Sequence, residues 1–530
     1  MLDVNALPND VDGLKRLLLE TVQVKDLQLK EKQHQIEHLK FQLAKLRRER
    51  FGQTSEKLQE AGQIPLTFEE LRAALAEAAG QAPAATAAAA PEKRKPVRRK
   101  ALPEHFERDD KIIEPASCVC PDCGGALSAL GKADESEVLE VKTVTFKVTR
   151  HIRPKKRCSK CSTIVQAPAP SRPIERSFAG ASLLALVLTW KYGFHLPLYR
   201  QCQIFAHAGL TLSRTTLMQW VGASSELLGP LVAALAKYVL CAPNLNADDT
   251  PIKVLAPGSG KTKKGRLWTY VRTGRGWGSR DPPAVWYRYS PSWHGRYPQQ
   301  HLATYHGKLQ VDGYAGFDAL FMPSGPNETA RVQEIACFAH ARRKLFDLYQ
   351  AMKSPVAKEG LDRIGVLYEI ETAIRGQSPE ARYAARQQHA VPVLKSLHAW
   401  LIDTRSRVEE KSIQAVAFDY TLHRWEELTR YTQDGRLEID NNAAERSLRG
   451  AGVGRKNYLF FGSDSGGDRA AIAYSLIETC KLNGIDPQRY LEYVLARIAD
   501  HPINRIEELL PWNVLDKLHQ PEQVRQAMAA

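Results

Sequence analysis

The 530-residue sequence lacks any run of about 18 apolar residues, the length that a membrane-spanning helix requires. Its first residues, MLDVN, also lack the basic start and apolar core of a secretory signal. Without such a signal, disulfide bonds among the nine cysteines are not expected. A hydrophobic fraction of 43% and a charged fraction of 25% exclude a wholly disordered chain. We therefore expect a cytosolic globular protein of several domains, with no membrane segment.

Acidic residues are missing from two stretches of a chain whose formal net charge is +15. Residues 93–100 (KRKPVRRK) contain six basic residues, and residues 142–157 (KTVTFKVTRHIRPKKR) contain seven. Two such patches suit a polyanion such as nucleic acid better than general solubility requires, although one alone fits a solvated charge run equally well. The expected DNA-binding residues in these patches are Arg94, Arg98, Arg99, Lys147, Arg150 and Arg153.

Five of the nine cysteines lie close together in the sequence. Four of them form two C-x2-C pairs separated by 34 residues, namely Cys120, Cys123, Cys158 and Cys161. Four thiolates complete the tetrahedral shell of Zn²⁺ and leave no open position, so the spacing predicts one structural zinc ion. Cys118 is a spare thiol that can compete with Cys120. Alternating apolar and polar residues over 144–153 predict a strand, and hence a β-ribbon stapled by zinc.

The N-terminal region carries a heptad pattern. Apolar residues recur every seven positions at Val22, Leu29, Ile36 and Leu43, which is typical of a coiled coil. Lysines interrupt the companion positions, so an amphipathic helix packed on its own domain remains an alternative. The coiled-coil interpretation predicts a homodimer or a higher oligomer.

A helical region precedes a region of strands. Residues 199–221 resemble a helix-turn-helix, with Gly209 at the turn, Ser213 as a cap and Arg214 facing DNA, although an ordinary helical hairpin fits equally well. Strands are then predicted at 245–255, 265–272, 284–289 and 308–311, with a helix at 299–305 before the last of them. This order, followed by helices, fits a ribonuclease H-like mixed sheet with an all-helical insertion.

The predicted fold class is therefore multidomain α+β. Its predicted parts are a coiled coil (11–58), an Ala-rich and basic linker (59–110), a zinc-binding domain (111–168), a helical DNA-binding region (169–240), a ribonuclease H-like catalytic domain (241–480) with a helical insertion at 343–430, and a helical C-terminal region (481–530).

Three acidic residues in the predicted catalytic domain stand at positions suited to metal binding. Asp248 lies in the first predicted strand. Asp312 follows the last one, with Gly313 next to turn the chain, and Glu445 lies in a predicted helix. Carboxylates from separate elements can converge on two Mg²⁺ ions, which prefer oxygen ligands and support phosphoryl transfer. Spacing alone does not select this triple, because the chain has 59 acidic residues.

Eight phrases of the sequence carry a resemblance to a known family. They are RFGQTSEKL (50–58), CPDCGG (120–125) with RHIRPKKRCSKC (150–161), HLPLYRQ (195–201), ADDTPIKVL (247–255), LQVDGYAGF (309–317), CFAHARRKLF (337–346), IDNNAAERSLR (439–449) and GRKNYLFFGSDSGG (454–467). With these phrases in this order, the chain resembles the insertion-sequence-66 family of bacterial transposases, which are DDE transposases.

The resemblance implies a DDE triad of Asp248, Asp312 and Glu445 with two Mg²⁺ or Mn²⁺ ions. The family's first motif usually reads Asp-Glu-Thr-Pro, whereas this chain has Asp248-Asp249-Thr-Pro, which makes Asp249 a rival ligand. His340 is expected near the site as a positioning residue. The remaining residues expected to contact DNA phosphates are Arg342, Arg343, Arg455 and Lys456, and a flexible turn is expected at Gly466 and Gly467.

The implied activity is cleavage of double-stranded DNA at the element's terminal inverted repeats and strand transfer into target DNA. Expected partners are DNA, further copies of the chain, and two small companion proteins encoded beside it, in the bacterial cytoplasm at the nucleoid. Two alternatives stay open. One is a ribonuclease H-fold nuclease that never joins DNA, and the other is an inactive zinc-dependent DNA-binding relative.

Overall fold

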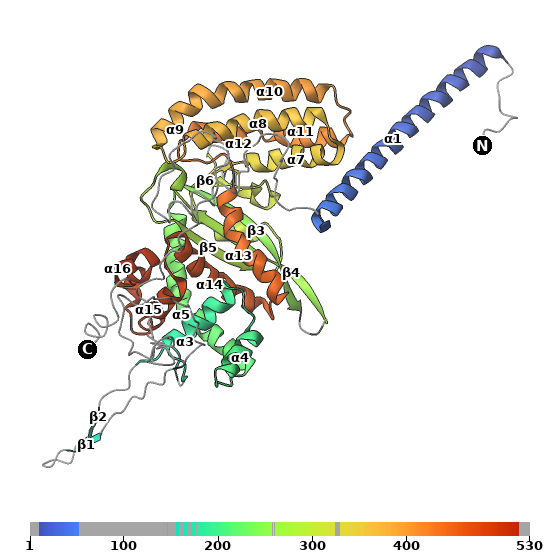
Figure 1. Cartoon of the computed structure of the whole chain (residues 1–530). Helices are drawn as coiled ribbons and strands as arrows, with labels where there is room; N and C mark the ends of the chain where they lie inside the picture. The colour runs from blue at the N-terminus through green and yellow to red at the C-terminus, as the bar shows by residue number, and fades with distance from the viewer. Residues whose placement is uncertain are drawn as a thin grey trace, which may run out of the picture. The chain divides into compact units, whose positions relative to one another are not determined.

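The computed structural model describes residues 10–51, 146, 155–157, 164–166, 171–175, 177–256, 258, 260–323 and 329–518. The four predicted zinc ligands lie outside the described residues. So does the basic run at 93–100, and of the run at 142–157 only residues 146 and 155–157 are described. Most of the predicted strand at 144–153 therefore also lies outside the described residues. The chain combines many helices with one five-stranded mixed sheet, so it is an α+β protein (Figure 1).

The N-terminal heptad segment is helical, as predicted. Helix α1 runs over Val11–Phe51, and the heptad residues Val22, Leu29, Ile36 and Leu43 are all exposed on it. Further along, β1 (Lys155–Arg157) and β2 (Ile164–Gln166) pair antiparallel and flank the second cysteine pair in the sequence.

The central sheet has the order β5-β4-β3-β6-β7. Its strands are β3 (Asn244–Ala256), β4 (Lys261–Arg272), β5 (Ala284–Ser290), β6 (Gly307–Gln310) and β7 (Val332–Ile335). Strands β3, β4 and β5 pair antiparallel in succession, whereas β6 pairs parallel with β3 and β7 parallel with β6. The four predicted strands are present. Strand β7 was not predicted.

The two faces of the sheet are covered by different helices. On one face lie α13 (Asn442–Tyr458) and α14 (Asp464–Leu482), where Thr269 bonds Ser447 and the Ser475 hydroxyl accepts from the Tyr287 amide. On the other face, Trp268 packs edge-on against Phe317 of η4 (Ala315–Leu320), and Tyr270 bonds His301 at the end of α6 (Arg296–His301). The predicted helix at 299–305 therefore begins and ends earlier than expected.

The predicted helix-turn-helix corresponds to α4 (Leu198–His207) and α5 (Arg214–Leu240). Gly209 has φ +85° at the turn, and the Ser213 hydroxyl accepts the Thr216 amide as the helix cap. Helix α5 is much longer than a second helix ending at Val221. By length and composition it could cross a membrane, but its buried residues belong to the core, as those of the core helix of a globular protein do.

Between β7 and α13 the chain forms a helical bundle, close to the predicted insertion at 343–430 (Figure 1). Its elements are α7 (Phe338–Met352), α8 (Pro355–Ala373), α9 (Pro379–Ala385), η5 (Arg386–Ala390), α10 (Val391–Ser406), α11 (Ile413–His423), α12 (Trp425–Thr429) and η6 (Arg430–Gln433). A fully buried carboxylate, Glu371, binds the guanidinium of Arg386 through both oxygens at 2.7 Å and that of Arg382 at 3.2 Å.

The remaining elements complete the core near the C-terminus and around α5. They are α3 (Ala181–Leu188), η2 (Thr189–Gly193), η3 (Arg275–Trp277), α15 (Pro487–Leu495), η7 (Ile503–Leu509), η8 (Pro511–Asn513) and α16 (Leu515–Leu518). Helix α15 packs on α3, and α14 packs on both α5 and β5.

Candidate active site

The first two predicted catalytic carboxylates lie on neighbouring parallel strands. Asn246 of β3 is the register partner of Gln310 of β6, and the amide of Asn246 donates to the Gln310 side chain at 3.1 Å. Asp248 and Asp312 each follow this pair by two residues. Because side chains alternate along strands, both carboxylates continue on the face where the two amides meet.

The third carboxylate comes from a helix on that same face. Glu445 lies in the first turn of α13, which packs on β3 and β4. Burial, and next the negative charge of Asp312, raise the pKa of Asp248 to about 8, and the charge of Glu445 contributes in the same direction. This electrostatic coupling indicates that Asp248, Asp312 and Glu445 form one cluster.

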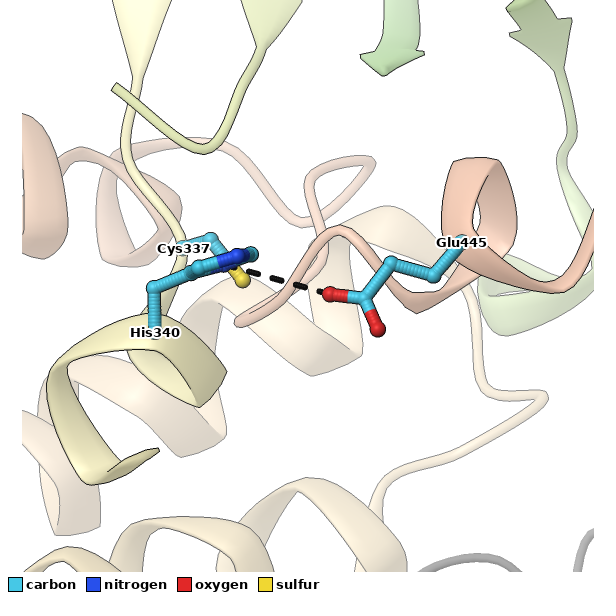
Figure 2. A group of neighbouring side chains, drawn as sticks. All are labelled: Cys337, His340 and Glu445. Carbon is cyan, nitrogen blue, oxygen red and sulfur yellow. Dashed lines mark ion pairs between the residues drawn. The ribbon is translucent and has the colours of Figure 1, made fainter. Parts of the chain in front are cut away.

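His340 and Cys337 join the cluster from the start of α7 (Figure 2). The side-chain heteroatoms of Cys337, His340 and Glu445 all lie within 4.8 Å of one another. The Nδ1 atom of His340 is 3.9 Å from Oε1 of Glu445, and neither buried atom has a hydrogen-bond partner among the described residues. Burial lowers the pKa of His340, although Glu445 and Asp312 oppose this effect, so the ring is mainly neutral at pH 7.

The thiol of Cys337 is buried and makes a hydrogen bond inside the protein. Its sulfur accepts the backbone amide of Asn441 at 3.1 Å, and burial raises the pKa of the thiol well above its usual range. A buried, protonated thiol is a poor metal ligand, since the thiolate is the form that binds metal. The chemistry of the cluster therefore rests on the carboxylates and His340.

One buried side chain ties the elements of the site together. The amide of Asn441, fully buried just before α13, donates to the carbonyl of Ala247 at 2.8 Å and accepts from the side chain of Asn246 at 3.0 Å. The backbone amide of Asn441 donates to the sulfur of Cys337, so this one residue joins β3, the start of α7 and the start of α13. Ala247 precedes Asp248 and Asn441 lies four residues before Glu445, so this residue fixes their separation.

The helical insertion holds the turn that carries Asp312. Gly313 adopts φ +91°, a conformation that favours glycine, as the sequence predicts for a turn at this position. The hydroxyl of Tyr420, on α11, donates to the carbonyl of Asp312 at 3.1 Å. Arg424 donates to the carbonyl of Gly313 at 3.2 Å and pairs with Glu334 at 2.6 Å.

Asp249, the rival ligand, has other partners. Its carboxylate accepts from Arg266 at 2.8 Å and from the indole N–H of Trp293 at 3.0 Å. Asp249 is the register partner of Trp268, which packs on η4, whereas Asp248 is the partner of Thr269, which bonds α13. The two adjacent aspartates therefore point to opposite faces of the sheet, as strand alternation predicts.

The basic residues expected to contact DNA differ in their exposure. Arg343, Lys456 and Arg214 are exposed, which fits contact with phosphate. Arg342 is only 5% exposed, so its expected phosphate contact does not fit its position inside α7. Arg455 is half-buried and donates to the carbonyl of Pro251 at 2.7 Å. The expected flexible turn at Gly466 and Gly467 is wrong, because both lie in the first turn of α14 beneath its cap Ser463.

Comparisons with known proteins agree with this arrangement. The transposase IS66 family profile matches residues 176–469, more than half of the chain. The chain belongs to the IS66 transposase family. Other profiles of the family match as well: its zinc-finger binding domain at 117–162, its C-terminal element at 475–512, and a segment described as "Transposase C of IS166 homeodomain" at 38–110.

Similar chains occur in Sinorhizobium fredii (strain NBRC 101917 / NGR234). The uncharacterized protein y4hP is 41% identical over 89% of this chain and 88% of its own length. The uncharacterized protein y4qI is 36% identical over 97% of this chain and 98% of its own length. The uncharacterized protein y4jD is 40% identical over 78% of this chain and 81% of its own length.

Sequence reasoning missed the residues that position the site in this IS66 protein. Asn441 stands within the quoted phrase IDNNAAERSLR, but nothing in the phrase says that this amide reaches β3. Tyr420 and Arg424 stand in a helical region that gave no sign of contact with Asp312. A polar residue at an otherwise apolar position, such as Asn246 in the buried run Leu245–Ala247, is the one signal that could have pointed to this network.

We predict that Asn441→Ala lowers the free energy of unfolding by about 2–3 kcal/mol, because it leaves the buried Ala247 carbonyl without a donor. It should also weaken Mg²⁺ binding, because Glu445 is no longer held against Asp248. Urea denaturation and Mg²⁺ titration measure the two effects. Asn457→Ala, at an exposed position of the same helix, is the control. Equal stability of the two variants would contradict the role given to Asn441.

The raised pKa of Asp248 predicts a pH dependence of stability in Mg²⁺-free buffer. The folded chain binds more protons than the unfolded chain between the ordinary pKa of 3.8 and the folded value of about 8, so stability falls as pH rises through this window. We expect the melting temperature to decline there, and Asp248→Asn to flatten the decline because an amide does not titrate. The exposed Asp500→Asn should keep the full decline. A decline that persists in Asp248→Asn would show that other groups cause it.

Proposed function

We propose that this IS66 family protein is a DDE transposase that cleaves DNA at the ends of its element and joins those ends to target DNA. The supporting observation is the cluster of Asp248, Asp312 and Glu445, in which burial, and next the charge of the neighbouring carboxylates, raise the pKa of Asp248. Groups with perturbed pKa values, gathered from separate elements, are typical of functional sites.

The donor set fits divalent magnesium or manganese. Three carboxylates supply the hard oxygen ligands that these ions prefer, and crowded negative charge is stabilised by a cation. The unpartnered atoms of His340 and Glu445 face each other at 3.9 Å, and two acceptors at this separation suit a cation as well. Asp248, Asp312 and Glu445 would hold two ions, which supply Lewis-acid activation of the attacking oxygen and stabilise the leaving one.

The proposed reaction consists of two successive nucleophilic displacements at phosphorus, and both take place at this site. In the first, the oxygen of water bonds to the phosphorus at the element end and the 3′-oxygen leaves, which frees a 3′-hydroxyl. In the second, that hydroxyl attacks a target phosphodiester and displaces the target 3′-oxygen. Because DNA itself supplies the second nucleophile, no covalent bond to Tyr or Ser is needed. Asn441 holds the start of α13, and with it Glu445, against β3.

The architecture of the catalytic region supports this proposal. Three antiparallel strands are joined to two parallel ones in the order β5-β4-β3-β6-β7, and this mixed sheet supports the ribonuclease H-like fold proposed for the region. The insertion between β7 and α13 gives this region a second part, which holds the Asp312 turn through Tyr420 and Arg424.

The zinc-binding region and helix α1 are proposed to support DNA binding and the pairing of protomers. A zinc ion held by the four cysteines would order the region matched by the family's zinc-finger profile, next to the basic run at 142–157. The exposed heptad residues of α1 would pair protomers, which sedimentation of the intact chain can test and which suits an enzyme that holds two DNA ends. We further propose action at the bacterial nucleoid with two small companion proteins.

The catalytic test uses a labelled element end with Mg²⁺, followed by analysis of nicked and joined products. Asp248→Asn, Asp312→Asn and Glu445→Gln should each lower cleavage by at least about a hundredfold, since each removes an anionic metal ligand. DNA binding should survive, because these substitutions keep the shape of the site. Normal cleavage by all three variants would refute the mechanism, and cleavage without joining would favour a plain nuclease.

Asp249→Asn is the matched control for Asp248→Asn. Its carboxylate lies with Arg266 and Trp293 on the opposite face of β3, so this variant should retain more cleavage activity than Asp248→Asn. The reverse ranking would mean that Asp249 is the metal ligand.

The zinc proposal predicts about one zinc ion per chain in the purified protein, measured by elemental analysis. Cys158→Ser should lose that ion and increase proteolysis near residues 117–162, because metal binding and local folding are coupled. Cys202→Ser, at a half-buried cysteine in α4, should keep the zinc. Zinc-free wild-type protein with intact DNA affinity would contradict the proposal.

A further inference from the structure

Strands β3 and β4 extend beyond the rest of the sheet as a two-stranded hairpin with one covered and one open face. On the covered face, Ile252 and Val254 are buried, and Gly265 packs so closely on Tyr289 that a Cβ would lie 2.6 Å from its hydroxyl. On the open face, Lys253 of β3 and Lys264 of β4 are exposed. The alternation of the strands thus leaves a basic surface on the face of the sheet opposite the catalytic carboxylates.

The charges on the two faces are arranged differently. On the covered face, Lys263 pairs with Asp464 at 2.6 Å. On the open face, Lys253 and Lys264 are direct register partners, and the described residues include no acidic partner for either. Like charges directly opposite each other destabilise a strand pair. A polyanion lying across both lysines would attract each of them and so offset this repulsion.

Around Asp249, the open face carries a cluster of aromatic and cationic side chains. Arg266, on the same face as Lys264, pairs with Asp249 and stacks over Trp293 at 4.0 Å. Trp293 also stacks on Tyr314 at 4.3 Å with an interplanar angle of 8°. Its indole is fixed by Asp249, yet the residue remains 47% exposed. Asp249 is adjacent to Asp248, and Tyr314 lies two residues after Asp312.

We propose that this open face, formed by Lys253, Lys264 and Arg266 with the exposed edge of Trp293, binds the backbone of duplex DNA on the side of the sheet opposite the catalytic carboxylates. The proposal deepens the proposed function, on which it rests, by assigning a DNA surface in the catalytic region itself. Charge complementarity selects the occupant, since Lys253 and Lys264 have no acidic partner among the described residues and can each contact a phosphate. Asp249 is a positioning residue in this arrangement, because it orients both Arg266 and Trp293.

The test is DNA binding by the intact Lys253→Gln/Lys264→Gln double variant, measured by anisotropy with a short fluorescein-labelled duplex of mixed sequence. Each phosphate contact contributes about 0.9 to the slope of log affinity against log salt, so the slope should become shallower by about 2. Affinity near physiological salt should fall on the order of tenfold or more. A slope and an affinity equal to those of the wild type would overturn the proposal.

Two controls separate binding from folding and from catalysis. The double variant should melt at the wild-type temperature or higher, because it removes a repulsion, and Lys395→Gln on the exposed side of α10 should leave the salt slope within about half a contact of the wild type. If Lys395→Gln lowers the slope as much as a hairpin lysine does, the hairpin is not a specific surface and the proposal fails. If the hairpin variant loses affinity while the wild type fails to cut element ends, the DNA surface stands and the transposase proposal fails.

Discussion

The active site depends on one buried amide. The side chain of Asn441 bonds the backbone beside Asp248 and the side chain of Asn246, and its backbone N–H donates to the sulfur of Cys337, four residues before Glu445. These contacts cross more than 100 positions of sequence, so neither β3 nor α13 can place its carboxylate alone. A side-chain amide suits this position because it donates and accepts at once, and its burial makes each unmade bond costly. The geometry of the site is therefore set by hydrogen bonding before any ligand binds.

The same geometry has an electrostatic cost. Gathering three carboxylates in a partly buried place disfavours their charged forms, and Asp248 bears the effect with a pKa of about 8. The fold tolerates this cost because other elements hold the acidic residues in place. The insertion contributes to this positioning, since Tyr420 donates to the carbonyl of Asp312 and Arg424 donates to the carbonyl of Gly313. A helical bundle that is remote in sequence thus helps to position a residue at the end of β6.

The sequence predicted the elements better than the contacts between them. Alternating residues predicted β3, β4 and β5, and the Asp312-Gly313 pair indicated a turn, because these features depend on local backbone preference. The exchange of bonds between Asn441 and β3 could not be predicted, since it depends on how α13 lies across the sheet. Arg342 was misjudged for the same reason: a motif gives the residue type, whereas tertiary packing decides that this guanidinium is buried. The four-residue strand β7 was not predicted from the sequence pattern.

The pair Asp248-Asp249 shows how one strand can serve two tasks. Period-two alternation sends the first carboxylate toward α13 and the second toward Arg266 and Trp293, so neighbours in sequence have unrelated surroundings. The first faces other carboxylates, an arrangement that calls for a cation. The second neutralises a guanidinium and fixes an indole, an arrangement that leaves the lysines farther along the same face without an acid. Strand alternation therefore separates a surface that attracts cations from one that attracts phosphates, and it keeps the two within one strand's thickness of each other.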